Sequence, residues 1–196
     1  MGWKGAIKGH QWRAPALPDF DLSFLDTITN PDLLREMLLP SWVRAFFIIW
    51  REAEARARRE GPRLADAIRK LAAEHREVRV LAFSLGTRVL HTALQDLNRR
   101  RPRVPLHVRL CGGAFPQKTR WQVPQSLLAG PIVNYWSKGD LPLRLLALRY
   151  GLLQQPIGLG KLQRCSAKYE NRHAHIDNVG VGHVDYERTF AQFGEL

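Results

Sequence analysis

The sequence is poor in the features that mark secreted, metal-binding and membrane-spanning proteins. It has only two cysteines, Cys111 and Cys165, which leave room for one internal disulfide but not for a disulfide framework or a cysteine metal site. No window reaches the roughly 18 uninterrupted apolar residues of a membrane span, and residues 1–12 lack the apolar core of a secretory signal. These absences predict a cytoplasmic protein in a reducing compartment.

Acidic residues are fewer than basic ones. The 196 residues include 30 Lys and Arg against 18 Asp and Glu, which gives a formal net charge of +12. A field of this sign attracts nucleic acid, anionic lipid head groups and acidic ligands alike. Arg99–Arg103 is a basic run typical of a solvated loop, and no aromatic residues alternate with its arginines to stack on bases. Nucleic acid is therefore the disfavoured partner, whereas peripheral contact with an anionic membrane remains open.

Hydrophobic periodicity predicts strands alternating with helices in a single domain over residues 1–196. Strands are expected at 6–12, 78–83, 106–111, 130–136 and 165–169, and helices at 31–38, 41–60, 64–71, 86–97, 141–150 and 186–193. Gly61-Pro62 is expected to break or kink the helical stretch around it. The alternation implies an α/β fold with a parallel sheet and helical crossovers on both faces, preceded by an irregular segment over residues 1–40.

The aromatic stretch Trp42–Trp50 has two interpretations. It either packs under the sheet as core or forms an interfacial patch, docking on lipid or covering an acyl site with the help of nearby arginines. Periodicity does not separate the two.

Residues 78–97 contain the motif on which the functional prediction depends. A buried strand, Val78–Phe83, turns directly into a helix through Ala82-Phe83-Ser84-Leu85-Gly86. This is the nucleophile-elbow arrangement, in which a sharp turn lifts a serine hydroxyl clear of the sheet edge, with Ala82 in place of the usual first glycine. Ser84 is therefore a candidate nucleophile, and its alternative role is the N-cap of the following helix.

Downstream residues supply the partners that a serine nucleophile needs. A serine hydroxyl requires a base to take its proton, usually a histidine held by a carboxylate, and in the hydrolase sheet these follow in the order Ser, Asp, His. Asp140 follows the strand that ends at Trp136, and His183 lies in a glycine-flanked turn. Ser84, Asp140 and His183 are thus the predicted catalytic residues.

Two of these residues also have a purely structural interpretation. Asp140 could cap the helix that begins at residue 141, and His183 could simply lead into the last helix, with Asp177 and Asp185 as competing carboxylates. The segment His173–Asp177 has the His-x-His-x-Asp spacing of some two-metal hydrolases, but the next position lacks the further histidine of such a site. No metal and no cofactor are predicted.

Taken together, these motifs resemble the α/β-hydrolase-like family that includes the transmembrane and coiled-coil domain proteins, with small bacterial relatives. The resemblance spans residues 50–190 and rests on Trp50 with its helix, Phe83–Val89, Gly112-Gly113-Ala114, Val133–Ser137 ahead of Asp140, and Gly182–Tyr186. It implies a three-layer α/β-hydrolase-like fold, mostly parallel, with reduced N-terminal strands. In such a fold the Leu85 amide would bind the oxyanion beside Phe83, and Gly9-His10 is the one candidate for a second donor.

The function expected from these features is a serine hydrolase, of esterase or lipase type, acting on a small-molecule or lipid ester. The alternative is a hydrolase-fold module with weak or no catalysis that binds an anionic membrane or a protein partner. The two hypotheses differ in whether Ser84 reacts covalently. The sequence carries no signal for an oligomeric state.

Overall fold

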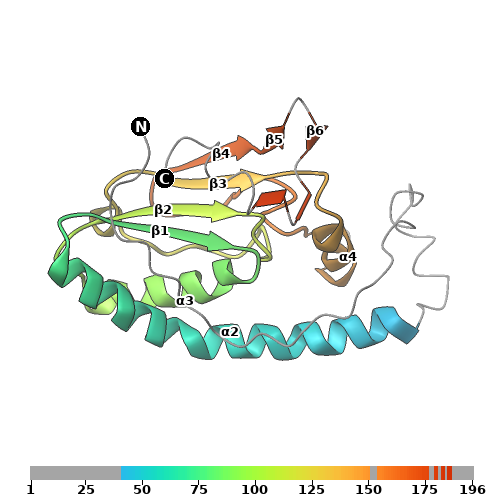
Figure 1. The fold of residues 1–196 in the computed structure, drawn as a ribbon, viewed down its shortest axis with the longest axis horizontal. Coiled ribbons are helices and arrows are strands. Elements are labelled where there is room, and N and C mark those ends of the chain that lie inside the picture. Colours follow the sequence, from blue (N-terminus) through green and yellow to red (C-terminus); the bar gives the residue numbers. More distant parts are fainter. Residues whose placement is uncertain (1–40, 151–153, 177–178, 181, 184, 187–196) are drawn as a thin grey trace.

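The computed structural model describes residues 41–150, 154–176, 179–180, 182–183 and 185–186, in an α/β arrangement (Figure 1). The helices are α2 (Ser41–Glu74), α3 (Gly86–Arg99) and α4 (Leu141–Tyr150), with one 3-10 turn, η2 (Gln125–Leu127). The strands are β1 (Val78–Phe83), β2 (Leu106–Cys111), β3 (Ile132–Trp136), β4 (Tyr169–His173), β5 (His175–Ile176) and β6 (Val179–Gly180). The strand predicted at 6–12, the helix predicted at 31–38 and residues 187–193 of the predicted last helix lie outside the described residues.

The four longer strands form one parallel sheet in the order β1-β2-β3-β4, as the alternation of strands and helices predicts. At the strand ends, Phe83 is in register with Cys111, and Cys111 with Tyr135. Because parallel strands run in one direction, the loops that follow β1, β2 and β3 all leave from the same edge. The predicted site residues lie at this carboxyl edge of the sheet.

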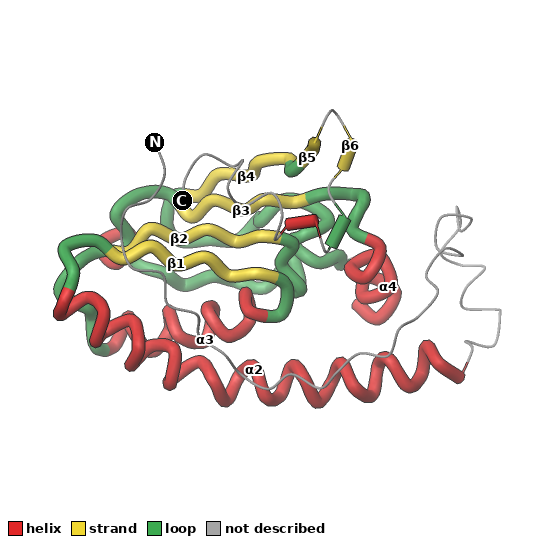
Figure 2. Tube along the Cα trace, viewed as in Figure 1, coloured by secondary structure: helices red, strands yellow, loops and turns green. Residues whose placement is uncertain are grey.

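Helices α2 and α3 pack on one face of the sheet (Figure 2). The contact is apolar and joins alternate strand residues to one stripe of each helix: Val78, Ala82, Leu106, Val108 and Leu110 from the strands, and Ala65, Ile68, Leu90, Ala93, Leu94 and Leu97 from the helices. The sequence predicts helices on both faces, but α2 and α3 share one face, and α4 packs against the N-terminal part of α2. The β2–β3 connection carries Pro116, Pro124 and Pro131, which prevent a crossover helix there.

Helix α2 is continuous through Gly61-Pro62, so the predicted break is wrong, while the alternative of a kink at this point stays a prediction. A Cβ on Gly61 would lie 2.4 Å from Cβ of Thr92 on α3, so the missing side chain lets the two helices approach closely. Pro62 is exposed, and water can satisfy the carbonyl that loses its intrahelical partner. Packing of α2 along α3 therefore outweighs the poor helix propensity of both residues.

The N-terminal half of α2 extends past the carboxyl edge of the sheet (Figure 1). Phe46 and Trp50 are buried there, with stacked rings 5.7 Å apart, and they share an apolar cluster with Leu143 and Leu146 of α4. The core interpretation is thus confirmed for these two residues, although they pack on α4 rather than under the sheet. Ile48, in contrast, is 70% exposed.

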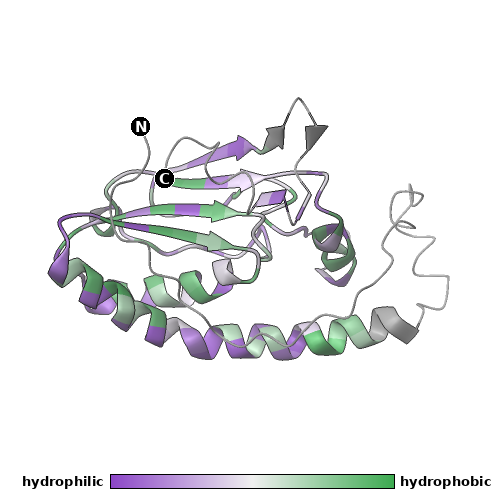
Figure 3. Ribbon diagram, viewed as in Figure 1, coloured by the Kyte–Doolittle hydropathy of each residue, from purple (hydrophilic) through white to green (hydrophobic). Residues whose placement is uncertain are grey.

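The last strand of the sheet begins four residues later than the predicted 165–169. Cys165 forms only an isolated bridge with Trp121, and β4 instead covers Tyr169–His173. In Figure 3, β4 is hydrophilic, whereas β1 and β2 are mostly apolar. Since β4 is an edge strand with mainly exposed side chains, it lacks the apolar pattern that would reveal it in the sequence.

Substitutions at the two α2 positions are predicted to act in opposite directions. Gly61→Ala should lower the free energy of unfolding by about 1 to 3 kcal/mol, because the new methyl group meets Thr92, although alanine favours helix. Pro62→Ala should raise it by about 1 to 3 kcal/mol, because it restores an intrahelical hydrogen bond at an exposed position. Urea denaturation of the two variants beside wild type measures both, and a stabilising G61A would contradict the close helix contact.

Candidate active site

Ser84 occupies the turn between β1 and α3 in a backbone conformation that L-residues rarely adopt. Its φ is 49°, and it is the one non-glycine residue with positive φ in the described part of the chain. The Ser84 amide donates to the Cys111 carbonyl at 3.0 Å, while its own carbonyl accepts from the amides of Thr87 and Ala114 and from the Thr87 hydroxyl. Hydrogen bonds at both ends of the residue hold the conformation in place, as expected of a nucleophile elbow.

Gly112, directly after β2, leaves the space in which the acidic residue sits. Its φ is +52°, and a Cβ there would lie 2.9 Å from Cε2 of Tyr186 and 3.2 Å from Oδ2 of Asp140. A Cβ on the neighbouring Gly113 would lie 2.6 Å from the side chain of Ile157. These contacts therefore explain why both Gly112 and Gly113 are glycines: a side chain at either position would clash with its neighbours.

Asp140 contacts both of the partners that the sequence suggests for it, the first turn of α4 and His183. Oδ1 accepts a hydrogen bond from the Leu143 amide at 3.0 Å, which caps α4, and Oδ2 lies 2.7 Å from Nδ1 of His183. The side chain is fully buried. Burial raises the pKa of Asp140, against the opposing effects of His183 and the Leu143 amide, so the ionised carboxylate depends on these two partners.

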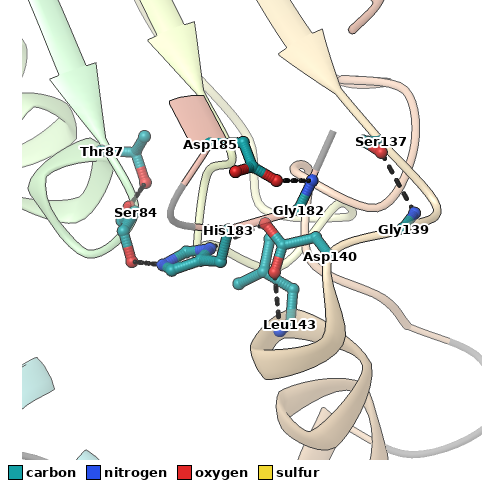
Figure 4. Close-up of polar contacts among 9 residues, drawn as sticks. All are labelled: Ser84, Thr87, Ser137, Gly139, Asp140, Leu143, Gly182, His183 and Asp185. Carbon is teal, nitrogen blue, oxygen red and sulfur yellow. Dashed lines mark hydrogen bonds and ion pairs between the residues drawn. The ribbon is translucent and has the colours of Figure 1, made fainter. Parts of the chain in front are cut away.

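His183 bridges the carboxylate and the hydroxyl (Figure 4). While Nδ1 faces Asp140, Nε2 lies 2.9 Å from Oγ of Ser84. The turn that carries the ring is closed by Asp185, whose Oδ2 accepts from the Gly182 amide and whose own amide donates to the Gly182 carbonyl. Asp185 therefore shapes the turn. The imidazole retains 17% of its side-chain surface exposed, so it can be reached from solvent.

The structure thus brings Ser84, Asp140 and His183 into one hydrogen-bonded chain, and their catalytic role stays a prediction. Leu85 lies directly before α3, and its amide donates no hydrogen bond within the described residues. The positive end of the helix dipole favours negative charge at this position. The Phe83 ring contacts the imidazole of His183 at a centroid distance of 4.8 Å, with the two ring planes tilted by 36°. Gly9-His10 and Asp177 lie outside the described residues.

A buried ionic cluster close to Ser84 is absent from the sequence prediction. Arg88 of α3 is buried and donates to Glu54 of α2 at 3.0 Å. Arg149 and the Tyr150 hydroxyl of α4 bind the same carboxylate. Burial, followed by the charge of Glu54, raises the pKa of Tyr150 to about 12. The cluster joins α2, α3 and α4, and its members are too far apart in sequence to be paired by spacing.

Two asparagines, the buried Asn134 and the half-buried Asn171, also escape sequence reasoning. The Asn134 amide group donates to the carbonyls of Ile157 and Gly160 and to the side chain of Asn171 on β4. These bonds hold the loop in which the Gly158 amide donates to the Gly113 carbonyl, behind the site. The only signal in the sequence is the polar Asn134 within the apolar strand predicted at 130–136.

Metal binding has no support in the described ranges. No group of three or more His, Cys, Asp or Glu side chains in them is arranged to hold a metal ion. His173 and His175 lie on different strands, β4 and β5.

Fold and site together define an α/β protein with a Ser-His-Asp chain at the carboxyl edge of a parallel sheet. The chain belongs to the family described as "Protein of unknown function (DUF726)", which matches residues 44–193. It is 32% identical over 139 residues to the rice (Oryza sativa subsp. japonica) "Transmembrane and coiled-coil domain-containing protein STS1", covering 69% of this chain and 19% of that protein.

It is also 24% identical over 147 residues to the Caenorhabditis elegans "Uncharacterized membrane protein F35D11.3", covering 73% of this chain and 24% of that protein. The chain thus spans a quarter or less of the length of these relatives. No solved structure matches it. Within the described ranges, no helix has the length and apolarity needed to cross a membrane.

Asp140→Asn is predicted to stabilise the fold at neutral pH. Burial raises the pKa of Asp140 above its ordinary value of 3.8, so the folded chain binds this proton more tightly than the unfolded chain does. At neutral pH the ionised carboxylate therefore lowers the free energy of unfolding. Asparagine keeps an oxygen for the Leu143 amide. We expect a higher melting temperature for D140N at pH 7, with the gain lost as the pH falls through about 3.8, where the aspartic acid is neutral in both states.

Thermal unfolding monitored between pH 3 and pH 8 measures this effect. Asp66→Asn, at an exposed carboxylate on α2, is the control and should show no such gain at pH 7. A lower melting temperature for D140N at pH 7 would mean that the bond to His183 outweighs the cost of burying the charge.

Proposed function

We propose that this chain is a serine hydrolase with an α/β-hydrolase-like fold, acting on an ester or acyl substrate. The observation that carries the proposal is the chain of contacts from Oγ of Ser84 to Nε2 of His183 (2.9 Å) and from Nδ1 of His183 to Oδ2 of Asp140 (2.7 Å). The positive φ of Ser84 in a strand-turn-helix junction supports it further.

In the proposed reaction, Ser84 Oγ attacks the carbonyl carbon of the ester while Nε2 of His183 accepts the hydroxyl proton. The protonated imidazole then gives that proton to the departing alcohol, and an acyl group remains on Ser84. Water, deprotonated by the same nitrogen, then attacks the acyl carbon, and the imidazolium returns the proton to Oγ of Ser84 as the acid is released. Asp140 holds Nδ1 in the protonated form and stabilises the imidazolium. The Leu85 amide is the proposed donor to the developing oxyanion, and the reaction needs no cofactor.

Covalent labelling by a fluorophosphonate tests the proposal. Wild type should be labelled at Ser84, and Ser84→Ala should abolish labelling, because the probe phosphonylates only an activated serine hydroxyl. His183→Ala should slow labelling by about a thousandfold or more, since it removes the base. Ser126→Ala, at an exposed serine that binds Arg101, is the control and should label as wild type does. Folded wild-type protein that does not react at Ser84 would refute the enzymatic proposal.

A second candidate function is binding to an anionic membrane surface. It is supported by the net charge of +12, by the exposed Ile48 on α2, and by the names of the two relatives, both of which refer to membranes. Binding to vesicles of phosphatidylglycerol should exceed binding to phosphatidylcholine, weaken as salt rises, and survive Ser84→Ala. Equal or absent binding to the two vesicle types in a sedimentation assay would remove this candidate.

A further inference from the structure

Tyr186 lies against Gly112, as does Oδ2 of Asp140, the carboxylate oxygen that faces His183. Its side chain is fully buried, as is that of Asp140. The ring fits against the bare Cα of Gly112, where a Cβ would come within 2.9 Å of Cε2 of Tyr186 and 3.2 Å of Oδ2 of Asp140. Tyrosine ring, glycine backbone and carboxylate therefore meet in a space that has no room for one further methyl group.

The ionisation of Tyr186 agrees with this placement. Burial raises the pKa of the phenol, and the neighbouring Asp140 and Cys111 raise it further, so the phenol stays neutral beside the carboxylate. Around Asp140, the polar donors are the imidazole and the Leu143 amide, one for each carboxylate oxygen. The remaining surroundings include the Tyr186 ring and the Gly112 backbone.

Phe83 extends this aromatic packing from Tyr186 to the imidazole of His183. Its ring centroid lies 5.9 Å from that of Tyr186 and 4.8 Å from that of His183. The two aromatic rings thus run along the Asp140-His183 pair from the carboxylate to the imidazole. Water admitted at this position would compete for Oδ2 of Asp140 and screen its attraction for the imidazole.

We infer that Tyr186 is a positioning residue whose ring closes Asp140 off from water and thereby holds the Asp140-His183 hydrogen bond in the geometry that His183 needs. This role rests on the proposed function, in which the Asp140 carboxylate has to stay in place and out of contact with water. The Tyr186 ring excludes the water, and the Tyr186 hydroxyl is not needed for it. The size limit set by Gly112 explains why a flat ring, rather than a bulkier group, can fill the space.

Proton NMR of the His183 Nδ1 proton tests the inference without any substrate. A proton shared with a buried carboxylate gives a downfield resonance, which is assigned by its loss in Asp140→Asn. Tyr186→Phe should leave the exchange of this proton with water within about twofold of wild type, whereas Tyr186→Leu and Tyr186→Ala should speed it by about tenfold or more, because water reaches the carboxylate. The control is Val133→Ala, in the same apolar cluster, which should leave the exchange unchanged.

Fluorophosphonate labelling rates provide the second readout. Y186F should label Ser84 like wild type, and Y186L and Y186A should label it about tenfold or more slowly, while V133A keeps the wild-type rate. Y186L keeps a folded reference if Y186A does not fold. Wild-type exchange in Y186L, or a loss in Y186F as large as in Y186L, would overturn the role given to the ring. If wild type is not labelled but exchange behaves as expected, the proposed enzymatic function fails while the positioning role of Tyr186 stands.

Discussion

The site depends on one backbone constraint, the left-handed conformation of Ser84 between a strand and a helix. Such a conformation costs roughly 1 to 3 kcal/mol for a residue with a side chain, and it persists only where the surroundings impose it. Here β2 supplies an acceptor through Cys111, the following loop supplies a donor through Ala114, and Thr87 closes the turn from within α3. The backbone conformation of Ser84 is therefore a property of the β1-β2 pairing as much as of the motif itself.

The site also requires that loop backbones approach neighbouring side chains and each other closely at the carboxyl edge of the sheet. Gly112 and Gly113 let the loop after β2 run between Asp140, Tyr186 and Ile157, and the loop around Gly158 lies directly behind them. Side-chain amides, not secondary structure, hold that loop: the buried Asn134 binds two of its carbonyls, and the half-buried Asn171 binds Leu162. Hydrogen bonds from a buried amide group favour one arrangement of a chain segment, here the loop behind the site.

Helix α4 links the site to the rest of the domain. Its first turn is capped by Asp140, so the carboxylate that faces His183 also determines where the helix begins. Its last turn is joined through Arg149 and Tyr150 to Glu54, and Glu54 in turn binds Arg88 on the helix that follows Ser84. Three helices thus share one buried carboxylate, and loss of Glu54 would leave the buried Arg88 without its carboxylate partner. Stability and site geometry are coupled through the same residues.

The sequence alone determined the elements with strong apolar periodicity or clear turn chemistry: β1, β2, β3, α3 and α4 lie where the pattern places them, and the order of Ser84, Asp140 and His183 indicated which side chains would meet. Only the tertiary structure decided the continuity of α2 through Gly61-Pro62, the position of the polar strand β4, and the ionic cluster at Glu54. The reason is physical. Periodicity reports how a segment partitions between water and core, whereas a helix kept intact by a neighbour, an edge strand exposed to water and a charge paired across helices depend on residues far away in the chain.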